Sequence, residues 1–140
     1  KDCGEIDFII VDEQNNRLIV ADSKYNKTRY EGVGYRTDYT NFTKYEIQIQ
    51  KKINWVQGNI GIVQTHFRKI YKNDNIYFEN FNVIGMFLIN TPTFYMYNSK
   101  YLVLTLNKVE DFLNNVDVNP MIKIQHKNTT YEYEYPYFTV

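Results

Sequence analysis

Two short apolar segments near the start of the chain, separated by a polar turn, restrict its fold most. Residues 8–11 read Phe-Ile-Ile-Val and residues 18–21 read Leu-Ile-Val-Ala, a composition typical of strands. Residues 13–16 read Glu-Gln-Asn-Asn, and asparagine tolerates the backbone of a tight turn. We therefore predict a β-hairpin with strands over Cys3–Asp12 and Arg17–Tyr25. Because these segments are apolar at successive positions, other elements should cover both faces of their sheet.

The remaining pattern predicts helices and further strands around this hairpin. Apolar residues at three- and four-residue steps predict a helix over Asn41–Gln57, with Asp38, Thr40 or Asn41 as its cap and Gly58 at its end, after a polar loop over Asn26–Thr40. Residues 59–71 fit either a helix or a strand. Further predicted elements are strands over Asn75–Phe81, Val83–Asn90 and Tyr101–Leu106, a helix over Val109–Asn115, and a closing hairpin of Met121–His126 and Tyr131–Tyr137. This order predicts an α/β (α+β) fold with a central mixed β-sheet and flanking helices.

Composition restricts the class of protein further. The chain has 140 residues, of which 44% are hydrophobic, which fits a single domain over residues 1–140 with a real core. No apolar run approaches the ~20 residues of a membrane span, so we expect no membrane partner. A single cysteine, Cys3, excludes an internal disulfide framework and makes a reduced, cytoplasmic compartment the default. A motif begins within four residues of Lys1, so we expect the C-terminal part of a longer chain, completed by an N-terminal region or a partner subunit.

Charge is balanced overall but unevenly placed. The 16 basic and 16 acidic residues cancel, yet residues 1–23 sum to −4, residues 24–72 to +7 and residues 73–140 to −3. An acidic strand pair followed by a basic segment is compatible with a phosphate-binding surface beside a metal site. Ordinary surface scatter explains the same charges and is the simpler interpretation of charge alone.

Three charged residues interrupt the two apolar strands. They are Asp7 in the first strand and Asp22 and Lys24 in the second. A turn centred on Gln14-Asn15 would place Asp7 opposite Asp22, whereas a turn one residue later would place Asp7 opposite Lys24. Strand side chains alternate between faces, so either register puts all three residues on one face, with facing Cβ atoms ~4.5–5.5 Å apart.

This trio has the composition of a divalent-metal site. Two neighbouring carboxylates repel each other unless a positive group lies between them, and Mg²⁺ accepts one or two carboxylates together with waters and phosphate oxygens. The backbone carbonyl of Ser23 could add a ligand to those of Asp7 and Asp22. The ammonium of Lys24 could then orient or help deprotonate a water, or stabilise charge on a phosphate.

At these residues the sequence resembles the PD-(D/E)XK nuclease superfamily, whose fold is called restriction-endonuclease-like. The resemblance lies in Gly4-Glu5-Ile6-Asp7, in Ala21-Asp22-Ser23-Lys24-Tyr25, and in a following helix with Tyr45, Gln48 and Lys52. It covers roughly residues 3–60 well and 83–115 loosely. It implies a metal-dependent nuclease, a hydrolase of nucleic acid with DNA favoured over RNA, using Mg²⁺ or Mn²⁺.

The resemblance also implies roles for single residues. Asp7 and Asp22 would bind the metal, Lys24 would serve the attacking water, and Gln48 and Lys52 would support the scissile phosphate. Basic residues of the middle segment would follow the nucleic acid backbone: Lys27, Arg29, Arg36, Lys44 and Lys52.

The sequence departs from the family pattern at several points, and other interpretations stay open. Ile6 stands where the family name has proline, Asp22 is the shorter of the two allowed acids, and the helix that usually precedes the hairpin is missing from the sequence. The trio could instead be an ion-pair cluster at a sheet end, and Lys52 a solvated lysine. The alternative function is a catalytically inactive, nuclease-like module that binds nucleic acid or protein within a larger assembly.

Overall fold

A four-stranded mixed sheet forms the centre of the computed structural model, which describes residues 3–118 and 121–134. Its strands are β1 (Phe8–Asp12), β2 (Arg17–Lys24), β3 (Asn82–Ile89) and β4 (Leu102–Thr105), in the spatial order β1-β2-β3-β4. β1 is antiparallel to β2, while β2, β3 and β4 run parallel to one another. The predicted α/β class and mixed central sheet are therefore confirmed.

The hairpin adopts one of the two registers that the sequence left open. Phe8 pairs with Ala21 and Asp12 pairs with Arg17, and Asn16 takes the left-handed backbone that the polar turn requires, with φ 50°. Continuing this register by one residue places Asp7 level with Asp22.

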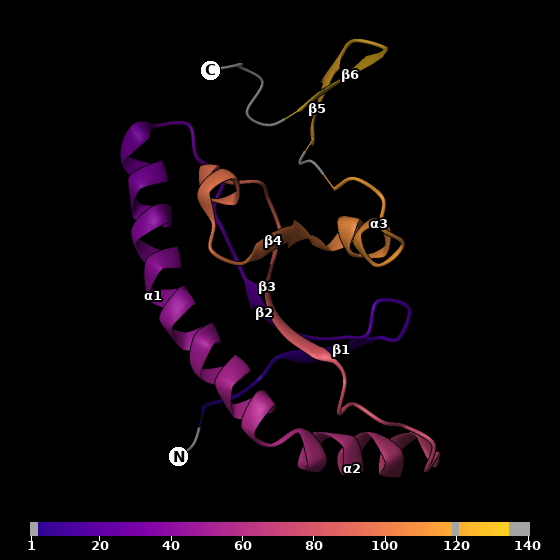
Figure 1. Cartoon of the computed structure of the whole chain (residues 1–140). Coiled ribbons are helices and arrows are strands. Elements are labelled where there is room, and N and C mark those ends of the chain that lie inside the picture. The colour runs from indigo at the N-terminus through magenta and orange to yellow at the C-terminus, as the bar shows by residue number, and fades with distance from the viewer. Residues whose placement is uncertain (1–2, 119–120, 135–140) are drawn as a thin grey trace.

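Two helices connect β2 to β3 and cover one face of the sheet (Figure 1). α1 (Gly32–Gly58) lies along this face, and α2 (Ile60–Tyr71) follows after a sharp change of direction. Their apolar residues form a buried core with β2 and β3, which includes Leu18, Val20, Phe42, Ile49, Ile53, Val56, Val63 and Phe87. Gly85 of β3 permits the close approach, because a Cβ there would lie only 2.7 Å from Cδ1 of Ile53.

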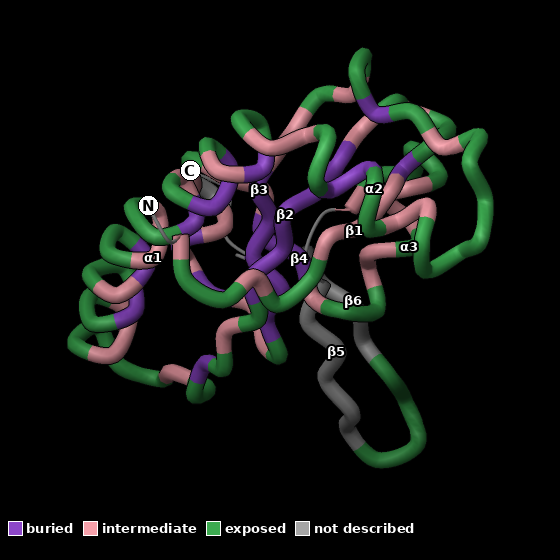
Figure 2. Tube along the Cα trace, turned by 90° about the horizontal axis from the view of Figure 1, so that it is seen from below, coloured by how far each residue is buried: buried purple, intermediate pink, exposed green. Residues whose placement is uncertain are grey.

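The opposite face of the sheet has its own smaller core. Ile19, Ala21, Met86, Leu88 and Leu104 are buried there. Residues of the short helix α3 (Val109–Leu113) pack against them. Burial is therefore concentrated in β2 and β3, at the centre of the fold (Figure 2), and the expectation that both faces of the hairpin sheet are covered is confirmed.

The remaining elements lie around the sheet. Two short 3₁₀ helices, η1 (Phe94–Asn98) and η2 (Leu106–Lys108), flank β4. β5 (Met121–His126) and β6 (Thr129–Glu134) form a separate antiparallel hairpin, as predicted, with Lys127 in the left-handed region at its turn. The part of the predicted last strand beyond Glu134 lies outside the described residues. None of the helices in the described ranges combines the length and apolar character that a membrane span needs.

The structure departs most from the sequence prediction at residues 26–40, at the start of β1 and at residues 75–81. The polar segment predicted as a loop already becomes helical at Gly32, because a buried ion pair between Asp38 and Arg29 ties the first turns of α1 to the preceding chain. The predicted caps Asp38, Thr40 and Asn41 therefore all lie inside the helix, whose N-cap is Glu31, although Gly58 ends the helix as predicted. β1 begins at Phe8, not at Cys3. Residues 75–81 form a loop instead of a strand, since the amide of the buried Phe78 donates to Gln64 of α2 and not to a neighbouring strand.

Candidate active site

Asp22 is the centre of a cluster of charged side chains near the end of β2. Its side chain is 0% exposed, and two lysines from different elements approach its two carboxylate oxygens. Nζ of Lys52, on α1, lies 2.6 Å from Oδ1, and Nζ of Lys24, on β2 itself, lies 3.3 Å from Oδ2. The carboxylate is thus held between the sheet and the helix that covers it.

Helix α1 supplies the wall of this cluster through two residues on one side of the helix. Tyr45 and Lys52 are seven residues apart, which is close to two helical turns. Nζ of Lys24 lies 4.7 Å from the centre of the Tyr45 ring, a cation–π distance. Lys24 is therefore held by a carboxylate and an aromatic face while remaining half-buried.

Asp7 reaches the same end of the hairpin from the residue before β1. Its Oδ2 accepts a hydrogen bond of 2.8 Å from the backbone amide of Ser23, the residue between Asp22 and Lys24. Asp7 is exposed, in contrast to Asp22. Asp22 and Lys24 are therefore in direct contact, and Asp7 is attached to the backbone between them from the solvent side.

The carboxylate oxygens of Asp7 and Asp22 are ligands of the kind that a hard divalent cation prefers. Lys24 and Lys52, which already contact Asp22, would compete with such a cation. Oδ2 of Asp22 is buried and makes no hydrogen bond among the described residues, and its neighbour there is the Lys24 ammonium at 3.3 Å. Within the described part of the chain there is no group of three or more His, Cys, Asp or Glu that could hold a metal. A site here would rest on the two carboxylates with water and phosphate oxygens, which Mg²⁺ accepts.

The burial of Lys52 was not expected from the sequence, which allowed a contact to the scissile phosphate, a contact to the nucleic acid backbone or a solvated lysine. Lys52 is only 8% exposed, so it is neither a solvated lysine nor placed on the surface to follow a nucleic acid backbone. Its position in the sequence carried a signal: it falls three residues after Ile49 and four before Val56, within the buried stripe of α1. A lysine in an apolar stripe needs a buried partner, and Asp22 is that partner.

The other candidate residues lie on the surface or in ion pairs elsewhere. Gln48 is exposed on α1, between Tyr45 and Lys52 in helical spacing. Lys27, Arg36 and Lys44 are exposed. Arg29 instead pairs with the buried Asp38, whose hydrogen bond raises the pKa of the guanidinium further above its ordinary value.

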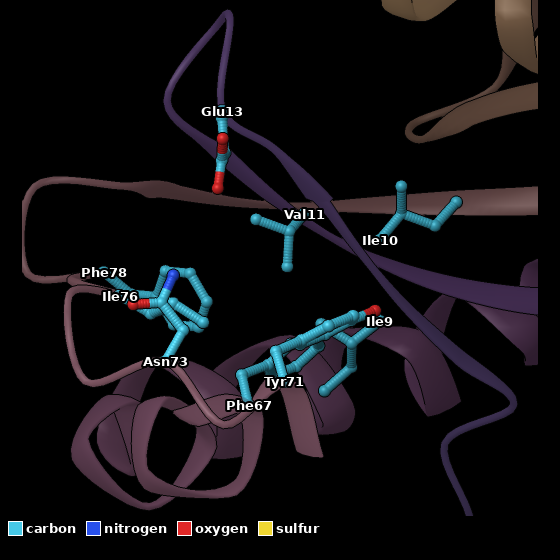
Figure 3. A pocket seen from close by; sticks show the side chains of 9 residues that line it. All are labelled: Ile9, Ile10, Val11, Glu13, Phe67, Tyr71, Asn73, Ile76 and Phe78. Carbon is cyan, nitrogen blue, oxygen red and sulfur yellow. The ribbon is translucent and has the colours of Figure 1, made fainter. Parts of the chain in front are cut away.

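Among the pockets lined by described residues, a larger and a smaller one lie near the hairpin, and the smaller one adjoins the cluster. The larger, about 780 Å³, opens between β1 and the end of α2; Figure 3 shows Ile9 and Val11 facing Phe67 and Tyr71 across it. Its lining contains none of the cluster residues. The smaller pocket, about 370 Å³, is lined in part by Ser23 and Lys24.

Comparison with known proteins adds no relative: no family model, curated protein or solved structure matches the chain.

Proposed function

We propose that the protein is a metal-dependent nuclease that hydrolyses phosphodiester bonds of nucleic acid, with DNA favoured over RNA. The observation that carries this proposal is the Asp22 carboxylate, wholly buried at a strand end, with Lys24 paired to it and Asp7 bonded to the amide of the adjacent Ser23. Burying ions costs several kcal/mol each in the effective environment of a protein. Such costs concentrate at functional sites.

The connectivity supports the same class of protein. A hairpin carrying Asp7 and the Asp22-x-Lys24 pattern is followed by a helix and then by a strand parallel to β2. This is compatible with the restriction-endonuclease-like layout that the sequence motif implies. A reduced, cytoplasmic compartment, in which Cys3 remains a thiol, fits an enzyme that acts on intracellular nucleic acid.

Each residue of the cluster has a distinct role in this proposal. Asp7, Asp22 and the carbonyl of Ser23 would hold Mg²⁺ or Mn²⁺. When bound, the cation would supply Lewis-acid activation of a water and neutralise charge at the phosphate. Lys24 would leave Asp22 to orient that water or to contact a phosphate oxygen. Lys52 would hold Asp22 in position, and Gln48, on the exposed part of the same helix side, would contact the scissile phosphate.

The direct test is cleavage of plasmid and single-stranded DNA in Mg²⁺ or Mn²⁺ by the wild type and by three variants. Asp22→Asn and Lys24→Met should each lower the rate at least about a hundredfold, the scale at which positioned acid–base groups contribute. Asp12→Asn is the matched control. Asp12 is also a buried strand aspartate paired with a cation, Arg17, but it lies next to the hairpin turn, at the end of the hairpin away from Asp22. Cleavage that persists undiminished in Asp22→Asn and Lys24→Met would contradict the proposed site.

One observation favours a second candidate function. Because Lys52 compensates Asp22 at 2.6 Å, the cluster is electrically satisfied without a cation. This is the arrangement expected of a nuclease-like module that binds nucleic acid or protein without catalysis. Such a module would show no cleavage and no stabilisation by divalent ions that depends on Asp7 and Asp22.

A further inference from the structure

We propose that the smaller pocket beside the Asp22 cluster binds a single unpaired nucleobase of the substrate strand. This inference rests on the proposed function and specifies its substrate: single-stranded nucleic acid, or a duplex from which one nucleotide has left the stack. The pocket measures about 370 Å³, within the range of ~300–1,000 Å³ that small-ligand pockets occupy.

The position of the pocket follows from strand alternation in β2. Leu18 and Val20 belong to the core under α1, whereas Ile19 and Ala21 belong to the core on the other face. Ser23 continues the second series, so it lines the pocket on the α3 face while Asp22 and Lys24 meet α1. The charged cluster and the pocket therefore adjoin through the Ser23–Lys24 segment. A polynucleotide crossing this strand end could present its phosphate to one and its base to the other.

The lining suits a flat apolar ring. Three large side chains at its rim remain in solvent: Phe8 is 52% exposed, Tyr25 is 82% exposed and Leu106 is 74% exposed. Exposed apolar side chains gathered around a cavity indicate a binding site. Aromatic faces at such sites stack on bases of any sequence.

Charge around the pocket selects an anionic ligand. Lys24 contributes to the lining while its ammonium lies next to the pocket, against Asp22 and Tyr45 on the α1 side, and Lys27 is exposed two residues after Tyr25. A base attached to a phosphodiester backbone satisfies both the apolar lining and these cations, which an uncharged apolar peptide would not. The one carboxamide in the lining, Asn90, already bonds the backbone of Asn26 through its oxygen (2.6 Å) and its nitrogen (2.9 Å). We therefore expect stacking to dominate, with little preference among the four bases.

The test measures binding without cleavage. The dissociation constants of a labelled oligo-dT strand and of a blunt duplex of equal length are determined by fluorescence anisotropy, with Ca²⁺ in place of Mg²⁺. Tyr25→Ala should weaken binding of the single strand about tenfold, the loss typical of one base–aromatic stack, and should change duplex binding little. Tyr25→Phe should retain the affinity. Tyr77→Ala, which removes an exposed tyrosine from the loop after α2, is the matched control and should match the wild type.

Each outcome decides the inference separately from the proposed function. Equal losses on single strand and duplex, or no loss with Tyr25→Ala, would overturn the base pocket, and the latter result is the one expected if the pocket receives a protein segment. Cleavage that requires Asp22 would still support the nuclease proposal in that case. Conversely, Tyr25-dependent binding of single strands without any cleavage would support the pocket and contradict the nuclease.

Discussion

At the scale of single residues, Asp22 influences both the stability of the fold and the proposed chemistry. A wholly buried carboxylate at a strand end is compensated by Lys52 from α1 and Lys24 from its own strand. Removing one partner of a buried pair leaves an uncompensated charge, which is more costly than the net value of the pair. The same three side chains therefore influence both stability and the proposed chemistry, and the two effects must be measured separately.

Replacing Lys52 measures the contribution of the Asp22–Lys52 pair to stability. Lys52→Met retains the apolar stem but leaves Asp22 without its closer cation, so the free energy of unfolding should fall by about 3–5 kcal/mol. The double variant Asp22→Asn, Lys52→Met should recover much of this loss, because no unpaired charge remains. Urea unfolding measures both values. A loss below about 1 kcal/mol for Lys52→Met would show that the pair is not the buried contact described.

Asp12 gives a second residue-level prediction, on pH. Burial alone would raise the pKa of Asp12, but hydrogen bonds from Arg17 and Asn15 outweigh burial and hold the pKa below its ordinary value of 3.8. A group with a lowered pKa in the folded state stabilises the fold fully above its ordinary pKa, and this contribution is lost as the pH falls toward the folded value. Unfolding free energy should therefore decline as the pH drops below about 5.

The control for this prediction is the neighbouring residue. Asp12→Asn should flatten the acid limb of the stability curve, whereas Glu13→Gln, at an exposed position of the same turn, should not. Parallel curves for wild type and Asp12→Asn in equilibrium unfolding at pH 3 to 6 would contradict the assignment.

Sequence alone predicted two possible hairpin registers for Asp7, Asp22 and Lys24, because alternation and turn chemistry act over a few residues. The Gln14-Asn15 register, in which Asp7 lies level with Asp22, is the one that forms. The contact between Asp22 and Lys52 was missed because it joins positions thirty residues apart. Only the depth at which α1 packs on the sheet decides whether such a lysine is solvated or buried.

At the scale of elements, α1 shows how tertiary contacts extend a helix beyond its local pattern. Gly32 and Gly34 disfavour a helix, which is why the segment before Asn41 was predicted as a loop. The structure compensates with contacts that sequence spacing does not reveal. Asp38 pairs with Arg29 at 2.8 Å, the Tyr35 hydroxyl donates to the Arg29 carbonyl, and the Tyr35 ring packs edge-on against Phe94.

The start of α1 should therefore depend on that ion pair. Asp38→Ala removes a charge-assisted hydrogen bond, typically valued at about 1.5–3 kcal/mol, and leaves Arg29 unpaired. Amide hydrogens of residues 34–40 should exchange about tenfold faster or more, while those of residues 49–56 stay protected. Lys44→Ala, at an exposed site in the same helix, serves as the control. Unchanged protection of residues 34–40 in Asp38→Ala would contradict this explanation of the early helix start.

At residues 75–81 the sequence predicted a strand where the structure has a loop. Its apolar residues resembled a short strand, but the Phe78 side chain fills the core under α1 and α2 and its amide donates to Gln64. A buried apolar residue in a loop gives the same sequence pattern as one in a strand, because a side chain can accept the hydrogen bond of its backbone amide in place of a neighbouring strand. Periodicity over so few residues does not distinguish these cases.

At the scale of the whole molecule, the predicted class of fold holds because the order of long apolar segments leaves few topologies. The strand after the helices must lie beside β2, and a crossover through α1 and α2 makes it parallel. Some of the charged residues behind the uneven charge along the chain form ion pairs within the fold. Arg29, Lys52 and Arg17 are used in buried or half-buried ion pairs, which leaves Lys27, Arg36 and Lys44 as the exposed candidates for contacts to a backbone.

We propose that Asp7 and Asp22 together hold a divalent ion, and a Mn²⁺ titration followed by thermal unfolding tests this proposal most directly. Ligand that binds only the folded state raises the unfolding temperature in a saturable manner. The wild type and Asp12→Asn should both show this rise, while Asp7→Asn and Asp22→Asn should not. An unfolding temperature that is independent of Mn²⁺ in the wild type, or that rises equally in Asp7→Asn and Asp22→Asn, would contradict the claim.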